Sequence, residues 1–248
     1  MVEAEPMLEV VSPGIQSLIQ DLGRIGFASV GVAQSGAYDS QALIRANEAV
    51  GNPGDLRGIE CLLGGLELRA LRETRLAWVL PYETSAEKVE LRRGETLTIP
   101  RLMRGVRAYA TVPGGIRTEW VLGSSSTDTM SGLDPAPLAT GDVLRGSTDV
   151  TDVVSALPAE GTVLPGSADA GSAASDTREA IEVVLSPGHG PFRPDAIRTL
   201  ETGVWSVSPM SSRVGMRLSG PGFGLTTGAD LRSQPVMGEP SSRPRTGN

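Results

Sequence analysis

Cysteine, histidine and lysine are almost missing from this sequence, which contains one of each among 248 residues. Because Cys61 is alone, no disulfide can form within the chain, and a zinc site built from several cysteines and histidines is excluded. Histidine-based catalysis would have to use His189 itself. Since Lys88 is the single lysine, nearly every basic side chain is an arginine.

Familiar signatures of nucleotide and ester chemistry are also missing. No Gly-Lys-Ser or Gly-Lys-Thr completes a phosphate-binding loop, and no G-x-G-x-x-G opens a helix after a strand. The G-x-S-x-G turn of serine hydrolases does not occur. A serine of the Ser124–Ser126 run would need an activating base to act as a nucleophile, so a role in capping backbone groups is the favoured alternative.

The chain is acidic, with a formal net charge of −7 and a pI of about 4.9. An acidic surface repels phosphate backbones, so no nucleic-acid partner is expected. No apolar run approaches the roughly 18 residues of a membrane span, and the N-terminus lacks a basic segment followed by an apolar one. The sequence therefore predicts a cytoplasmic protein without a membrane partner.

Aromatic residues make up only 4% of the chain, whereas 31 glycines and 18 prolines favour many short strands and turns. Residues 59–63 and 66–68 flank Gly64-Gly65 and predict a hairpin. Alternation of apolar and polar residues over 106–112 predicts a half-buried strand. Short strands at this spacing indicate a mainly β fold, either a sandwich or a barrel.

Two segments predict helices. Asp39 is a good N-cap for a helix over residues 40–50, whose apolar residues recur on one face. Residues 194–200 predict a second, short helix, and residues 204–207 predict a strand after it.

Residues 155–180 are rich in alanine, glycine, serine and proline without periodicity, which indicates a flexible linker. A second β segment is predicted from residue 181, so the sequence divides into two β regions.

Five glycines lie among polar residues over residues 14–36. Such a stretch could hold a ligand or a partner chain, or it could be the turn-rich start of a β-barrel. Asp21 and Arg24, with Arg213 and Arg217 later in the chain, could bind a carboxylate, bicarbonate or phosphate. Alternatively, each arginine pairs with a nearby carboxylate or carbonyl and fixes a corner of the barrel.

These motifs match one known family in order and spacing. The matches are Pro13-Gly14, Gln20-Asp21-Leu22-Gly23-Arg24-x-Gly26, Ser35-Gly36-Ala37-x-Asp39, Ala46-Asn47, Val50-Gly51-Asn52, Gly105-x-Arg107-Ala108-Tyr109, Leu122-Gly123-Ser124-x-Ser126-Thr127-Asp128 and Val207-Ser208-Pro209-x-Ser211-Ser212-Arg213-Val214-Gly215-x-Arg217-Leu218. Over nearly its whole length the chain resembles the C subunit of bacterial ATP-dependent 5-oxoprolinase. That family is also described as Kip antagonist, allophanate hydrolase subunit 2 or biotin-dependent carboxyltransferase domain.

The resemblance implies a mainly β fold of two cyclophilin-like β-barrel subdomains with one or two short helices. The first subdomain is expected over residues 1–154 and the second over residues 181–248, joined by the linker 155–180. After Gly238 the sequence departs from the family's pattern, so the second subdomain is expected to be truncated at its C-terminus. A frameshift in the gene is one hypothesis for this departure, and resequencing the coding DNA tests it.

The function implied is that of one subunit of a heteromeric hydrolase that cleaves 5-oxoproline to glutamate with ATP hydrolysis, inactive alone. Its expected partners are a Kip-inhibitor-like B subunit and an A subunit. ATP is expected to serve the complex, without a clear site on this chain. One alternative is a biotin-dependent carboxyltransferase or allophanate hydrolase-type subunit of urea metabolism, with biotin as cofactor. Another is a non-catalytic antagonist of a kinase inhibitor.

The resemblance assigns no residue a catalytic role, and no metal site is predicted. Polar residues of the matching motifs are the candidates for the surface that binds the substrate or the B subunit. These candidates are Gln20, Asp21, Arg24, Ser35, Asp39, Asn47, Arg213 and Arg217.

Overall fold

The computed structural model describes residues 5–133, 135–146, 183, 185, 192–213 and 215–224. It divides the chain into two compact units, Met1–Ala173 and Ala174–Asn248. The predicted linker and nearly all of the strand predicted from residue 181 lie outside the described residues. Each unit is therefore described by itself.

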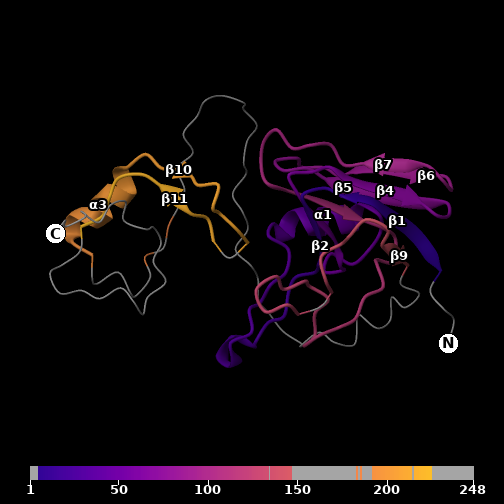
Figure 1. Cartoon of the computed structure of the whole chain (residues 1–248), viewed down its shortest axis with the longest axis horizontal. Coiled ribbons are helices and arrows are strands. Elements are labelled where there is room, and N and C mark those ends of the chain that lie inside the picture. The colour runs from indigo at the N-terminus through magenta and orange to yellow at the C-terminus, as the bar shows by residue number, and fades with distance from the viewer. Residues whose placement is uncertain are drawn as a thin grey trace, which may run out of the picture. The chain divides into compact units, whose positions relative to one another are not determined.

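Among the described residues of the first unit, nine short strands form two antiparallel sheets (Figure 1). The four-stranded sheet has the order β7-β4-β1-β9, with bounds Thr96–Thr98, Leu66–Ala70, Pro6–Pro13 and Val143–Arg145. The five-stranded sheet has the order β2-β3-β8-β5-β6, with bounds Gln16–Gln20, Gly58–Leu62, Arg107–Thr111, Thr74–Val79 and Glu87–Leu91. The predicted mainly β fold is confirmed, although the described strands form two sheets and not one closed barrel.

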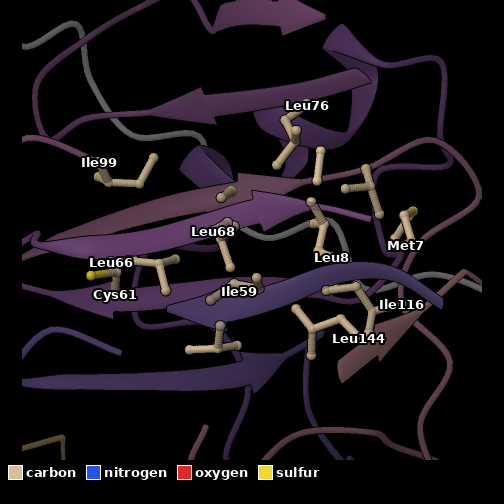
Figure 2. Close-up of a cluster of buried hydrophobic side chains, with 14 of the residues drawn as sticks. Met7, Leu8, Ile59, Cys61, Leu66, Leu68, Leu76, Ile99, Ile116 and Leu144 are labelled. Atoms are coloured by element: carbon tan, nitrogen blue, oxygen red, sulfur yellow. The ribbon is translucent and has the colours of Figure 1, made fainter. Parts of the chain in front are cut away.

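Apolar side chains from both sheets meet in the main core of this unit (Figure 2). Leu8 and Leu68 from the four-stranded sheet pack with Ile59 and Leu76 from the five-stranded sheet, and all four are almost fully buried. Cys61 lies in the same cluster, and burial raises the pKa of its thiol. The core of this chain, which has few aromatic residues, is thus filled mainly by aliphatic side chains.

Helix α1, Ser40–Ala49, covers the other face of the five-stranded sheet. As predicted, Asp39 caps it, because its Oδ1 accepts a hydrogen bond of 2.9 Å from the amide of Ala42. The prediction that β8 is half-buried is wrong, since all five of its residues are buried. The helix explains the difference: Leu43 packs on Tyr109 from one side while the main core covers the opposite face.

The predicted hairpin around Gly64-Gly65 is also wrong. Strand β3 pairs with β2 and β8, whereas β4 pairs with β1 and β7, so the glycine pair carries the chain from one sheet to the other. Leu63, Gly64 and Gly65 all adopt positive φ, at 56°, 72° and 82°. Three successive left-handed residues turn the chain out of its own sheet, which a hairpin turn would not do.

Replacing Gly64 with alanine is expected to lower the free energy of unfolding by about 3 kcal/mol or more, because strain at a positive φ adds to a clash. A Cβ at this position would lie 2.0 Å from the carbonyl oxygen of Pro100. Gly65→Ala is the matched control, since its Cβ would meet nothing closer than 3.8 Å, and we expect a loss of only about 1 kcal/mol there. Equal losses in urea-unfolding curves would contradict the steric explanation.

The second unit contains helix α3, Pro194–Thr202, and a two-stranded ladder of β10, Ser206–Val207, with β11, Leu218–Ser219. The helix predicted over 194–200 is confirmed, and the strand predicted from residue 204 begins two residues later. Trp205 joins these elements, because its Nε1 donates a hydrogen bond of 3.0 Å to the carbonyl of Leu200. Within the ranges described in both units, no helix is long and apolar enough to cross a membrane.

Candidate functional site

Asp21 lies at the centre of a hydrogen-bonded cluster that joins the start of the glycine-rich loop, residues 20–39, to a serine segment, residues 124–126. Its Oδ1 accepts hydrogen bonds from the hydroxyls of Ser124 (2.7 Å) and Ser126 (2.5 Å), and its Oδ2 accepts one from the amide of Ser125 (2.6 Å). The amide of Gly23 donates to the same carboxylate at 2.7 Å. One side chain therefore fixes two loops that lie about a hundred residues apart.

The three serines are fully buried, which bears on their chemistry. Ser124 and Ser126 donate their hydroxyl protons to Asp21, and the amide of Ser126 donates to Ser124 Oγ at 3.0 Å. Ser125 Oγ accepts a hydrogen bond of 3.2 Å from Arg57 Nη1. A hydroxyl without solvent access cannot reach a substrate in this arrangement, so the geometry favours capping over nucleophilic attack.

Arg24 reinforces the same junction from the other side of the cluster. Its side chain is buried, with Nε donating to the carbonyl of Val121 (3.3 Å) and Nη2 to that of Ser126 (2.6 Å). Burial acts to raise the pKa of Asp128, but hydrogen bonds from Ser131 and Met130, with a smaller contribution from the charge of Arg24, hold that pKa below its usual range. Arg24 thus binds backbone carbonyls. This agrees with the alternative prediction that the arginine pairs with a nearby carbonyl and does not bind an anion.

Gln20 extends the junction into strand β2. Its Nε2 donates a hydrogen bond of 3.0 Å to the carbonyl of Thr127, whose amide donates to the carbonyl of Ile19 at 2.9 Å. Gln20 is fully buried, so it contributes to the scaffold of the cluster and not to its surface.

The other candidates of the first unit shape the loop and the helix that follows it. Ser35 adopts a φ of 55° beside Gly36, where a Cβ would come within 2.8 Å of the backbone of Leu22. Asn47 is buried in α1, where its Nδ2 donates to the carbonyl of Leu56 at 2.5 Å. Ser35 and Gly36 thus shape the loop, the Asp39 cap fixes the start of α1, and Asn47 ties the helix to the segment that follows it.

A second buried network lies on the face of the five-stranded sheet toward α1, and the candidates chosen from the sequence did not include it. Glu60 Oε2 accepts hydrogen bonds of 2.8 Å from the amide of Tyr38 and from the hydroxyl of Tyr109. That hydroxyl accepts a hydrogen bond of 2.7 Å from the amide of Asp39. Arg107 Nη1 lies 3.3 Å from Glu60 Oε1, and both side chains are buried.

A sequence signal for this network exists. A glutamate interrupts the apolar strand around residue 60, and an arginine and a tyrosine occupy alternate positions of β8. Charges of opposite sign on two neighbouring central strands are rarely buried unless they pair. Burial and the charge of Glu60 raise the pKa of Tyr109, so its hydroxyl stays protonated and keeps donating to the carboxylate.

Arg213 and Arg217 belong to the second unit. Arg213 lies in the turn between Ser212 and Gly215, which form an isolated β-bridge, and it is half-buried. Arg217 is exposed, and its backbone amide donates a hydrogen bond of 2.9 Å to Ser211 Oγ. Anion binding by Arg213 and Arg217 stays a prediction. In the described part of the chain, no group of three acidic, cysteine or histidine side chains is arranged to hold a metal.

Comparison with known proteins gives a consistent result. The family described as carboxyltransferase domain, subdomain A and B, matches residues 30–238. The chain is 29% identical to the C subunit of 5-oxoprolinase from Escherichia coli over 254 residues, which is 93% of this chain and 74% of that protein. It is 35% identical to the urea amidolyase of Saccharomyces cerevisiae over 233 residues, but it spans only 12% of that protein's length.

The fold is shared with solved structures as well. The crystal structure of the K. lactis urea amidolyase matches 91% of this chain with a TM-score of 0.67 and 28% sequence identity. The match covers 14% of that protein. The compared region is thus one part of a much larger chain there.

Proposed function

The chain belongs to the carboxyltransferase-domain family of subdomains A and B, and from this premise we propose that it is the C subunit of a heteromeric 5-oxoprolinase. The complex would open the lactam of 5-oxoproline to glutamate with hydrolysis of ATP. The observation that supports this assignment is the alignment with the C subunit of a 5-oxoprolinase over most of both chains. Homology to that protein also implies partner subunits, which we propose to be a Kip-inhibitor-like B subunit and an A subunit.

We assign ATP binding to the complex and not to this chain, because the sequence lacks a phosphate-binding loop. The finer architecture proposed is two cyclophilin-like β-barrel subdomains, of which the two sheets around the main core would form the first. The glycine-rich loop would face the substrate or the B subunit. In support, its course is fixed by Asp21, Glu60 and the Asp39 cap while Tyr38 remains about half exposed.

A second candidate function is favoured by the identity with the urea amidolyase of yeast. In that case the chain would serve a biotin-dependent carboxyltransferase of urea metabolism. Family membership itself fits this candidate as well as it fits the first.

One experiment separates the two candidates. The chain is coexpressed with its B-like and A-like partner subunits, and the purified complex is offered either 5-oxoproline with ATP or urea with carboxybiotin. We expect glutamate release in the first assay and no turnover in the second. Biotin-dependent turnover of urea would support the second candidate. Stable association with the B-like partner but no turnover in either assay would reject both and leave a regulatory role.

A further inference from the structure

Residues 25–33 form the tip of the glycine-rich loop, and this tip is apolar and exposed. Ile25 and Val30 are 74% and 71% exposed, and Phe27 and Val32 are half-buried. No residue from 25 to 37 carries a charge, although charged residues make up 21% of the chain. Single exposed apolar side chains are common on protein surfaces, but a cluster of them in an uncharged loop indicates a surface that another molecule covers.

Below the tip, residues 21–24 and 34–37 pack closely against each other and form a neck. A Cβ on Gly23 would lie 2.5 Å from the carbonyl oxygen of Gln34, so only a glycine lets the two segments approach this closely. The amide of Arg24 closes the neck with a hydrogen bond of 2.8 Å to the same carbonyl. The tip therefore starts from a closed base.

The buried polar cluster around Asp21 holds this neck in place. Asp21 and Arg24 both belong to the neck, and their side chains bind the serine segment, residues 124–126. Arg24 also donates to the carbonyl of Val121, which places the turn after Trp120 beside the neck. Trp120 is 40% exposed, so the apolar surface continues from the tip onto this turn.

The tip itself is folded by its own backbone and projects from the unit. The carbonyl of Phe27 accepts hydrogen bonds from the amides of Val30 (3.1 Å) and Val32 (3.2 Å), and the short 3-10 helix η1, Ala28–Val30, lies between them. Within the described residues, no hydrogen bond joins the tip to a segment outside the loop. Figure 1 shows the tip, in indigo, extending away from the two sheets of the first unit.

The chemistry of the tip favours a protein partner over other ligands. A projecting loop cannot enclose a small molecule, and residues 25–33 offer no cation to a nucleic acid or to an anionic lipid surface. Apolar side chains without charges are typical of the buried centre of a protein interface. Because the neck fixes the tip, little conformational entropy would be lost when a partner binds it.

We propose that the tip, residues 25–33, inserts into an apolar groove on the Kip-inhibitor-like B subunit. The inference rests on the proposed function, which supplies this partner, and it assigns the tip to the partner and not to the substrate. The matching region of the K. lactis urea amidolyase makes up 14% of that chain, so it is joined there to much more protein. A separate B subunit would supply such a protein surface to this chain.

Isothermal titration calorimetry with the purified full-length chain and the purified B-like subunit tests the proposal. The tip variant carries both Ile25→Ser and Val30→Ser. We expect its Kd for the B-like subunit to rise about a hundredfold, roughly tenfold for each aliphatic side chain that is no longer buried. Both side chains are exposed in the isolated chain, so the urea-unfolding curve of the tip variant is expected to stay close to that of the wild type.

Met103→Ser is the matched control, because Met103 is 97% exposed and lies on the connection between β7 and β8. We expect this variant to bind the B-like subunit as the wild type does. The proposal would be overturned if the wild type did not bind the B-like subunit, or if the tip variant bound it as tightly as the wild type. Equal weakening in Met103→Ser and the tip variant would overturn it as well.

Sedimentation velocity of the isolated chain tests a second copy as the occupant of the tip. We expect the same sedimentation coefficient for the wild type and the tip variant. A wild-type dimer that dissociates in the tip variant would assign the tip to a second copy of this chain and overturn the proposal.

This binding test and the activity assay can fail independently. Binding that depends on the tip, in a complex that releases no glutamate, would support the insertion while rejecting the 5-oxoprolinase assignment. Glutamate release by the complex, together with unchanged affinity of the tip variant for the B-like subunit, would do the reverse.

Discussion

Replacing Glu60 with glutamine is expected to lower the free energy of unfolding by about 3–5 kcal/mol, the usual cost of breaking a buried ion pair from one side. Glu60 is fully buried, and Arg107 is the charge it offsets. Glutamine has nearly the same size as glutamate, and its side-chain oxygen can still accept the hydrogen bond from the Tyr109 hydroxyl. The loss of stability therefore measures the cost of leaving the guanidinium of Arg107 without an opposite charge. Urea-unfolding curves at neutral pH measure it.

Two further variants show whether the pairing causes this loss. Glu9→Gln is the matched control, because Glu9 pairs with Arg69 at 2.7 Å on the surface, where such pairs contribute about 1 kcal/mol or less. The double variant Glu60→Gln, Arg107→Met is expected to lose clearly less stability than the sum of the two single variants, since it leaves no lone buried charge. The stabilising role of the buried pair would be contradicted if the losses of the two single variants simply added up in the double variant. A loss of stability in Glu60→Gln no larger than that in Glu9→Gln would contradict it as well.

Asp21→Asn is expected to lower the free energy of unfolding by roughly 2–4 kcal/mol, because a buried donor that loses its acceptor is left desolvated without a hydrogen bond. Four donors converge on the Asp21 carboxylate, three of them from the serine segment. In the asparagine variant an NH2 group replaces one of the two carboxylate oxygens. This group cannot accept a hydrogen bond, so at least one of these donors would be left without an acceptor. The loss is measured by urea unfolding against the same Glu9→Gln control.

Hydrogen exchange gives the Asp21 prediction a local readout. The amide of Ser125 donates to Asp21 Oδ2, so its protection is expected to fall in Asp21→Asn more than that of amides in β8. Unchanged protection at Ser125 together with unchanged stability would show that the junction does not depend on Asp21.

Local signals in the sequence predicted part of this structure well. The Asp39 cap with its helix, the short helix after Pro194 and the mainly β character all depend on neighbouring residues, and the structure confirms them. The predictions that were wrong, the hairpin at Gly64-Gly65 and the half-buried strand β8, depend on contacts between residues far apart in the sequence. A glycine pair between two apolar runs is compatible with a hairpin and with a crossing between sheets, and only the pairing of the two strands with distant partners decides between them.

The candidate site shows the same division. Asp21 and Arg24 stood out because they lie in a glycine-rich, polar stretch, yet their partners in the serine segment lie about a hundred residues away, and no periodicity connects the two. Arg107 was hidden for the opposite reason. It alternates regularly along a strand, and the pattern predicted an exposed side chain, whereas Arg107 is buried beside Glu60 and the ring of Tyr38.

Glutamate release from 5-oxoproline, measured with ATP and each subunit omitted in turn, tests the central claim most directly. We predict release by the complex of this chain with its B-like and A-like partner subunits, and only a background rate when this chain or ATP is left out. Equal release without this chain, or none from the complete complex, would contradict the assignment.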